Sequence, residues 1–255
     1  MSLKPLRLFV QILMVGLLLG VSSTAAYADA ISVSAVTFSS FQITPAVGTV
    51  TFTPTASSTV ALATNSLGQT APMMSNTFPI AQSNTAVTFA SSSAVANATT
   101  FTATANSVVA LTGCTCAASS AGQANLSGTF VITGGDGNVN VNISALFTTM
   151  STLMTDQTGA FDQSQVITTL LVDGVAIFDV TNVFNITSNA SDVQARIHQI
   201  SESLTLAFNV PHTISVHIHA GSFAENQVPE PGTLALLGLG IMSMGFINRR
   251  RVKNT

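Results

Sequence analysis

The stretch VITTLLVDGVAIFDV, residues 166–180, decides the fold class of this chain. Two apolar runs rich in β-branched residues flank the pair Asp173-Gly174. Because Asp-Gly supplies the positive φ angles of a type I′ turn, it is the strongest short-range signal for a β-hairpin. We therefore predict two antiparallel strands, residues 166–172 and 175–180, joined by a two-residue turn.

Similar alternation lies on both sides of this hairpin. Residues 130–133 and the alternating Val139, Val141 and Ile143 flank a glycine-rich turn at 134–137, which predicts a second hairpin with one polar face. Residues 204–208 and 214–218 alternate in the same way and predict a third pair. Prolines argue against long helices in residues 29–125, and they stand at Pro45, Pro54, Pro72 and Pro79. The expected fold is an all-β antiparallel β-sandwich over residues 29–225.

One short helix is expected within this body. Residues 191–194, Ser-Asp-Val-Gln, have the form of a capping box. Val193, Ile197 and Ile200 follow at helical spacing. The pattern therefore predicts a helical turn between the second and third strand pairs.

Charge is scarce and unevenly placed. Only 7% of the 255 residues are charged, against about 25% in an ordinary soluble domain. From residue 29 to 228 the chain holds one base, Arg196, and nine acids, so the formal charge of the body is −8. Nucleic-acid binding requires clustered lysine and arginine. We therefore expect no nucleic-acid partner.

The first 28 residues have the organisation of a secretory signal peptide. Two bases precede an apolar stretch at residues 8–21, and Ala26 and Ala28 occupy the small-x-small positions of a cleavage site. We expect signal peptidase to cut after Ala28, so that Asp29 becomes the first residue of the exported protein.

A second apolar run, residues 233–247, lies near the other end of the chain. Its 15 residues would form a helix about 22 Å long, which spans a hydrocarbon core of about 30 Å only marginally. The basic end, residues 249–253, follows and contains Arg249, Arg250 and Arg251. By the positive-inside tendency, these arginines stay on the cytoplasmic side. We expect a short transmembrane helix, so the membrane is contacted only through this tail.

The four residues Val228, Pro229, Glu230 and Pro231 stand directly before that run. The prolines keep this segment extended and deny the helix an upstream continuation. Motif, helix, arginine cluster and signal peptide together resemble the PEP-CTERM sorting signal, over about 28 C-terminal residues. This resemblance implies a Gram-negative host that makes exopolysaccharide. It also implies removal of the tail, residues 226–255, by an exosortase, a membrane-embedded cysteine protease or transpeptidase.

The same resemblance implies an address rather than an activity. The protein would pass through an inner-membrane-anchored intermediate and then reach the cell surface or the extracellular space. Bodies that carry PEP-CTERM signals are diverse, so no catalytic residue is transferred by the resemblance.

Candidate metal ligands are few. His217 and His219 alternate with Ile218 and face one side of a predicted strand, where two imidazoles can share a metal ion. No third ligand is evident, so we expect surface histidines and no metal or cofactor. The amides after Asp136 imitate the opening of a calcium loop, but Val141 and Phe147 stand where an EF-hand needs glycine and glutamate.

Cys114 and Cys116 form the sequence Cys-Thr-Cys in an exported body, where oxidation is favoured. Because a bridge between residues this close is geometrically demanding, three states stay open: a local disulfide, a link to another chain, and free thiols.

Enzyme motifs are missing from the body, which lacks a Gly-x-Ser-x-Gly elbow, a His-Glu-x-x-His pair and any lysine. A glycosidase needs only two carboxylates, and the candidates are Asp173, Asp179, Asp192, Glu202 and Glu225. The leading hypothesis is a non-enzymatic cell-surface or matrix protein associated with exopolysaccharide or biofilm. A carbohydrate- or calcium-binding module is the alternative, and a polysaccharide-acting enzyme comes last.

The amino-acid composition disfavours sugar binding on an aromatic platform. The chain has no tryptophan, and its single tyrosine, Tyr27, leaves with the signal peptide. Thirteen phenylalanines remain in the body, and most of them stand at alternating positions typical of a core.

Overall fold

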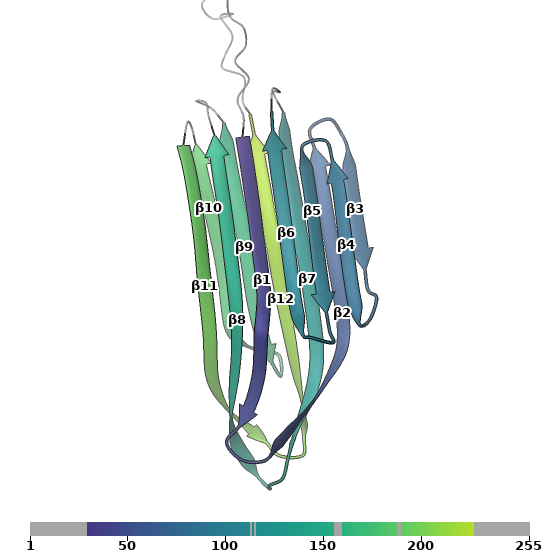
Figure 1. The fold of residues 1–255 in the computed structure, drawn as a ribbon, viewed down its shortest axis with the longest axis vertical. Coiled ribbons are helices and arrows are strands. Elements are labelled where there is room, and N and C mark those ends of the chain that lie inside the picture. Colours follow the sequence, from purple (N-terminus) through teal and green to yellow (C-terminus); the bar gives the residue numbers. More distant parts are fainter. Residues whose placement is uncertain (1–29, 113, 115, 156–159, 188–189, 227–255) are drawn as a thin grey trace, which may run out of the picture. The chain divides into compact units, whose positions relative to one another are not determined.

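The computed structural model describes residues 30–226 except for 113, 115, 156–159 and 188–189 (Figure 1). These residues form twelve strands, and no helix occurs among them. The strands are β1 (Ala30–Pro45), β2 (Thr49–Asn65), β3 (Thr70–Ser75), β4 (Ile80–Val87), β5 (Ala90–Asn97), β6 (Thr102–Leu111), β7 (Ala117–Thr133), β8 (Asn138–Thr155), β9 (Phe161–Val172), β10 (Val175–Thr187), β11 (Ala190–Ala207) and β12 (Pro211–Glu225). Both predicted terminal helices lie outside the described residues.

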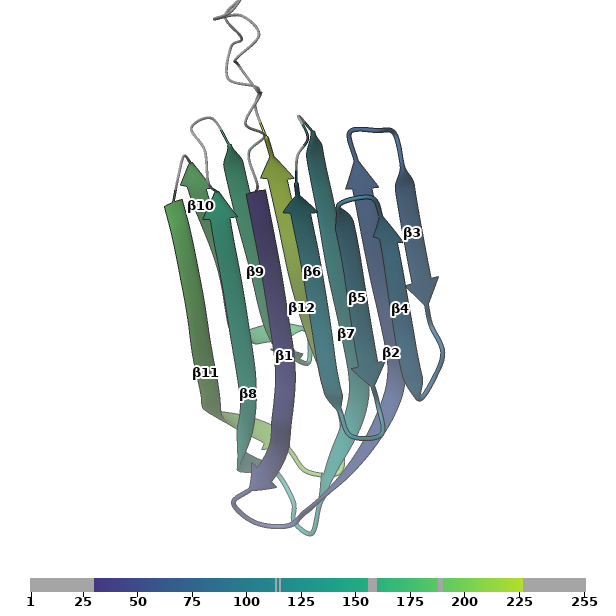
Figure 2. The ribbon, with the colours of Figure 1, turned by 45° about the horizontal axis from the view of Figure 1, so that its top comes forward.

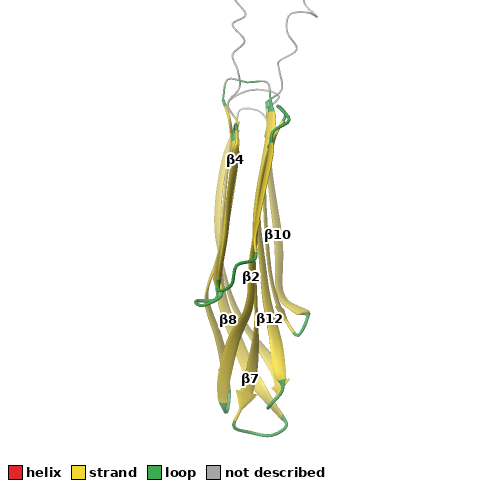
Figure 3. Cartoon of the chain, turned by 90° about the vertical axis from the view of Figure 1, so that its right-hand side faces the viewer, coloured by secondary structure: helices red, strands yellow, loops and turns green. Residues whose placement is uncertain are grey.

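The strands form two six-stranded sheets, and every strand pair is antiparallel. The first sheet has the order β11-β8-β1-β6-β5-β4, and the second has the order β10-β9-β12-β7-β2-β3. Figures 2 and 3 show the two sheets as facing layers. The predicted all-β antiparallel sandwich is therefore confirmed.

The Asp173-Gly174 hairpin is also confirmed. Val172 and Val175 pair across a two-residue turn between β9 and β10. Asp173 and Gly174 have φ angles of +50° and +78°, as a type I′ turn requires. The local turn signal in the sequence therefore predicted this pairing correctly.

The other two predicted hairpins are wrong, although their strands exist. The turn at 134–137 joins β7 of the second sheet to β8 of the first, and residues 208–210 join β11 of the first sheet to β12 of the second. In each case the flanking strands pair with other partners: β7 with β12 and β2, and β8 with β1 and β11. The turns therefore connect the layers instead of closing hairpins.

The predicted helical turn near residue 191 is wrong as well. The segment belongs to β11, an edge strand that pairs with β8 along its whole length. Val193 and Ile197 point outward and are 66% and 71% exposed, whereas Ile200 faces the core. Valine and isoleucine at solvent-exposed positions of an edge strand break the usual alternation of apolar and polar residues, so their spacing resembles that of a helix. The backbone hydrogen bonds to β8 nevertheless hold this segment as a strand.

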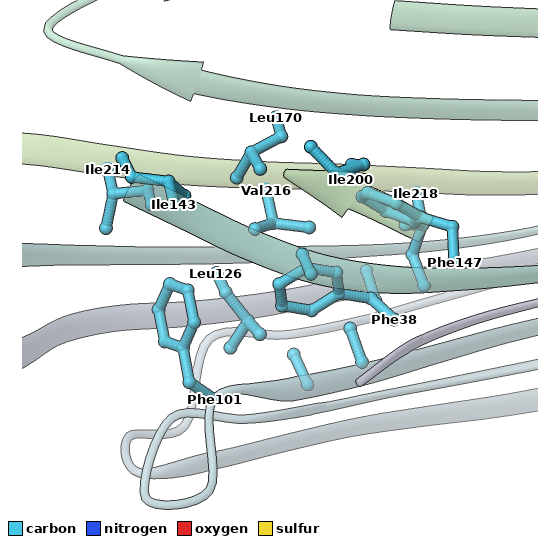
Figure 4. Packing of buried hydrophobic residues seen from close by; sticks show 14 of the residues in the cluster. Phe38, Phe101, Leu126, Ile143, Phe147, Leu170, Ile200, Ile214, Val216 and Ile218 are labelled. Carbon is cyan, nitrogen blue, oxygen red and sulfur yellow. The ribbon is translucent and has the colours of Figure 1, made fainter. Parts of the chain in front are cut away.

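Large side chains fill one half of the space between the sheets. Phe38 is fully buried and lies against Phe41, Phe101 and Phe147, with ring centroids 6.2, 6.0 and 4.9 Å away. Figure 4 shows Phe38 among branched aliphatic residues from both sheets. Burial of this apolar surface is the main stabilising contribution in this half.

Small residues fill the other half, and the sheets approach closely there. Ser34 Oγ lies 2.6 Å from Ser164 Oγ, 3.0 Å from Ser222 Oγ and 2.6 Å from the Gly221 carbonyl oxygen, all on the opposite sheet. Ser107 Oγ likewise lies 2.6 Å from Ser120 Oγ. Buried hydroxyls thus hydrogen-bond across the layers, as buried polar groups must.

The Ser34→Ala variant tests this serine contact. Removing the hydroxyl deletes hydrogen bonds and leaves buried partners unsatisfied, so we expect the free energy of unfolding to fall by about 2 kcal/mol. Urea denaturation measures the change. Ser91→Ala, on the outer face of the first sheet, is the control and should change stability by less than about 0.5 kcal/mol.

One carboxylate is enclosed in this narrow half. Asp162 on β9 is fully buried, and neither carboxylate oxygen has a hydrogen-bond partner among the described residues. Burial raises the pKa of Asp162 to about 7, although the nearby backbone amides of Met154 and Ile31 oppose the shift without reaching hydrogen-bonding geometry. Asp162 is therefore neutral below that pH and a destabilising charge above it.

Candidate functional site: the outer face of the second sheet

The centre of the second sheet presents an uncharged polar surface to solvent. It is formed by the outward residues of β9, β12 and β7, which are neighbours in that order. We call this surface the histidine–amide face, and it comprises Gln163, Gln165, Ile167, Thr169, His217, His219, Gly221, Phe223, Ala121, Gln123 and Asn125. The predicted candidates His217 and His219 lie at its centre, and both are half-buried by neighbouring strands.

Residues from five strands form a row across this face. Asp179 of β10, Thr169, His217, Asn125 and Ser58 of β2 stand opposite one another in register. Thr169 donates to Asp179 over 3.2 Å, and Asn125 Nδ2 donates to Ser58 Oγ over 3.2 Å. Hydrogen bonds at both ends of the row therefore hold its side chains in position.

This row orients the imidazole of His217. In the structure Asn125 Nδ2 faces Ser58 Oγ, and Asn125 Oδ1 lies 2.6 Å from His217 Nδ1. An amide oxygen only accepts, so Nδ1 carries the proton and Nε2 keeps an acceptor lone pair. His217 thus offers one fixed acceptor on the face.

His219 lies beside a glycine two residues further along β12. A Cβ atom built on Gly221 would come within 2.9 Å of His219 Nε2. Gly221 therefore gives the imidazole ring room to lie along the strand, away from His217. A side chain at position 221 would displace the ring.

Both imidazoles are uncharged at neutral pH. Burial lowers the pKa of His217 below its ordinary value. Burial also lowers the pKa of His219, with a smaller contribution from the neighbouring His217. A face that contains neutral imidazoles and amides has hydrogen-bonding capacity without net charge.

The geometry does not support a shared metal ion. His217 is oriented toward Asn125, and His219 toward Gly221. Within the described residues, no group of three or more histidine, cysteine, aspartate or glutamate side chains is placed to hold a metal ion. For the calcium interpretation, Asn140 and Asn142 instead accept hydrogen bonds from Thr205 and Ser201 of the neighbouring strand β11.

Aromatic rings also reach this face, contrary to the core position that alternation favours for phenylalanine. Phe161 of β9 and Phe223 of β12 both have outward positions, and their ring centroids lie 5.9 Å apart. Phe223 follows Gly221 on the same strand. The face therefore combines aromatic and amide groups from strands that are distant in sequence.

The remaining candidates have structural contacts. Asp173 accepts from the Thr213 backbone amide (2.7 Å) and lies 2.7 Å from His212 Nδ1. Cys114 and Cys116 are joined by a disulfide, and Asn226 hydrogen-bonds to the backbone carbonyls of both. The pairing of Asp173 with His212 had no signal in the sequence beyond the turn itself.

Several predicted site residues lie outside the described residues: Ala26, Ala28, Asp29, Val228, Pro229, Glu230, Pro231, Arg249, Arg250 and Arg251. In the part of the chain that the structure describes, no helix is long and apolar enough to cross a membrane.

Comparison with known proteins identifies one segment. The family model of the PEP-CTERM protein-sorting motif matches residues 227–251. No curated protein and no solved structure shows significant similarity to the chain. The match confirms the resemblance inferred from the C-terminal sequence, and it implies export with processing by an exosortase. This protein is therefore an all-β protein with a C-terminal PEP-CTERM sorting motif.

Proposed function

We propose that the protein is a non-enzymatic component of the cell surface or extracellular matrix, associated with exopolysaccharide. The observation that carries this proposal is the position of the sorting motif. The motif match begins at residue 227, directly after β12 and Asn226 complete the sandwich. The motif thus follows the β-sandwich directly, and the cargo that it delivers contains this sandwich.

The placement of three of the body's acids supports a non-catalytic role, whereas the candidates Asp192, Glu202 and Glu225 are at least partly exposed. Asp162 is enclosed between the sheets, and Asp173 is engaged by His212 and Thr213. Asp179 accepts a hydrogen bond from Thr169 at the edge of the histidine–amide face. General acid–base catalysis requires titratable groups that reach a bound substrate, and these three groups have structural partners or are buried.

Intact-mass analysis of protein recovered from medium and envelope tests the proposal. We expect a chain that begins at Asp29 and ends near residues 228–231, lighter by two hydrogens than the reduced form because of the Cys114–Cys116 bond. The double variant Pro229→Ala/Pro231→Ala should retain the tail, whereas the body variant Pro72→Ala should be processed normally. Full-length chain found only in the cytosol would refute export, and turnover of the host polymer by the purified body would refute the non-enzymatic role.

A further inference from the structure

The histidine–amide face has hydrogen-bonding groups that no other described residue uses. Gln123 stands opposite His219, and Gln165 stands opposite Gly221. Among the described residues, neither glutamine side chain has a hydrogen-bond partner, although both are partly accessible. His217 adds the acceptor at Nε2 that its contact with Asn125 leaves free. The face therefore presents donors and acceptors from three adjacent strands.

Rings provide the second component of the face. The imidazole of His219 extends along β12 toward Gly221, and the Phe223–Phe161 pair follows. Rings such as these offer apolar area to a flat partner, while the nearby amides satisfy its polar groups. Hydroxylated pyranose rings have both kinds of surface, since their C–H faces are apolar and their edges bear hydroxyl groups.

The dimensions of the face suit an extended chain. Residues 217 to 223 of β12 span about 20 Å at about 3.4 Å per residue, and the three strands together are about 10 Å wide. Polar contacts along β12 are flanked on both sides by the glutamines. A polymer lying along the strand could therefore make repeated contacts instead of a single one.

The charge near the histidine–amide face determines which class of polymer it can bind. The row through His217 contains one acid, Asp179, at its edge, and Glu225 lies at the end of β12. The single base of the body, Arg196, belongs to β11 of the first sheet and lies 5.6 Å from the Phe184 ring centroid. With a body charge of −8 and no base on the face, a polyanion would be repelled.

We propose that the histidine–amide face binds a neutral polysaccharide chain lying along β12. This inference rests on the proposed function, because it specifies the ligand and the surface of the exported sandwich.

Affinity electrophoresis of the purified, disulfide-bonded body tests the proposal. The probes are the neutral and acidic fractions of the producing cells' extracellular polysaccharide, separated by anion exchange. We expect the neutral fraction to retard the body and the acidic fraction to leave its mobility unchanged. Retardation should be the same at low and high salt, because the interaction does not involve ion pairing.

Substitutions on the histidine–amide face test whether the polysaccharide binds there. Gln123→Ala/Gln165→Ala removes two amides, and Gly221→Ala displaces the His219 ring without removing it. We expect each to weaken binding about tenfold, the effect of losing one or two neutral hydrogen bonds. Gln82→Ala, at an exposed position of β4 on the first sheet, is the matched control. Thermal unfolding must show that each variant is folded.

Three outcomes would overturn the inference: no retardation by the neutral fraction, retardation only by the acidic fraction, or equal affinity in the Gln82 and face variants. No retardation by either fraction would also refute the proposed association with exopolysaccharide. Retardation only by the acidic fraction, or equal affinity in the Gln82 and face variants, would refute this binding site alone, and the mass analysis decides export separately.

Discussion

We expect the Asp162→Asn variant to be more stable than the wild-type protein at pH 8 and nearly as stable at pH 4. The wild-type carboxylate is fully buried without a hydrogen-bond partner in the described structure, and its pKa is raised to about 7. Asparagine has the same shape and stays neutral. The difference between the variants therefore reports the free energy of ionising Asp162 inside the sandwich.

The direction of this pH dependence follows from the number of protons that the folded and unfolded states bind. Between the ordinary aspartate pKa of 3.8 and about 7, the folded state holds a proton on Asp162 that the unfolded state has lost. Stability then falls as the pH rises, by about 1.4 kcal/mol per pH unit, and levels off above pH 7. The advantage of asparagine should reach a few kcal/mol, with an upper bound of about 4 kcal/mol.

His217 and His219 change the pH dependence of stability in the opposite direction to Asp162. Their pKa values are lowered, so they contribute stability that is present above the ordinary histidine pKa of 6.5 and is lost as the pH falls. Comparing the variant with the wild type at each pH cancels this contribution. Asp136→Asn, in the exposed turn between β7 and β8, is the control.

Urea denaturation at intervals from pH 4 to pH 8 measures both curves. A stability difference that grows with pH and then becomes constant supports the buried carboxyl group. Parallel curves, or a variant that is less stable at pH 8, would contradict it.

The Gly122→Ala variant should be strongly destabilised. A Cβ atom at Gly122 would lie 2.6 Å from the Ser93 carbonyl oxygen and 2.7 Å from the Asn106 carbonyl oxygen, both on the opposite sheet. Backbone atoms in a paired strand cannot move aside as a side chain can. One added methyl group would therefore push the sheets apart, and we expect a loss of about 3 kcal/mol, at the upper end of overpacking effects.

Ala121→Val is the matched control for this substitution. It adds more volume on the same strand but on the outward side, where β7 meets solvent. Its effect on the urea midpoint should be small. If Gly122→Ala costs less than about 1 kcal/mol, the close approach of the sheets at this point is refuted.

Local turn chemistry predicted one hairpin correctly and two incorrectly. Asp173-Gly174 joins strands that pair with each other, so a two-residue signal was sufficient. At residues 134–137 the glycines likewise mark a turn, with positive φ at Gly134 and Gly137. Whether the next strand pairs with the previous one or crosses to the other sheet depends on long-range packing. A turn sequence does not contain that information.

The candidate site could be predicted from the sequence only in part, for the same reason. His217 and His219 were recognised from their alternation along one strand. Gln123 and Asn125 lie about ninety residues away, and only the β7–β12 register places them opposite these histidines. Most phenylalanines were expected in the core, yet Phe223 has an outward position, as the inward positions of its neighbours on β12 require.

The first and last strands occupy the interiors of their sheets. β1 lies between β8 and β6, and β12 lies between β9 and β7. Until Glu225 has crossed the membrane, the second sheet is split into two parts, one of β10 and β9 and the other of β7, β2 and β3. A chain emerging from a translocation channel has every strand of the first sheet before β12 arrives, but its second sheet stays in two parts until that final strand is delivered. Completion of the sandwich would thus coincide with delivery of the sorting motif that follows it.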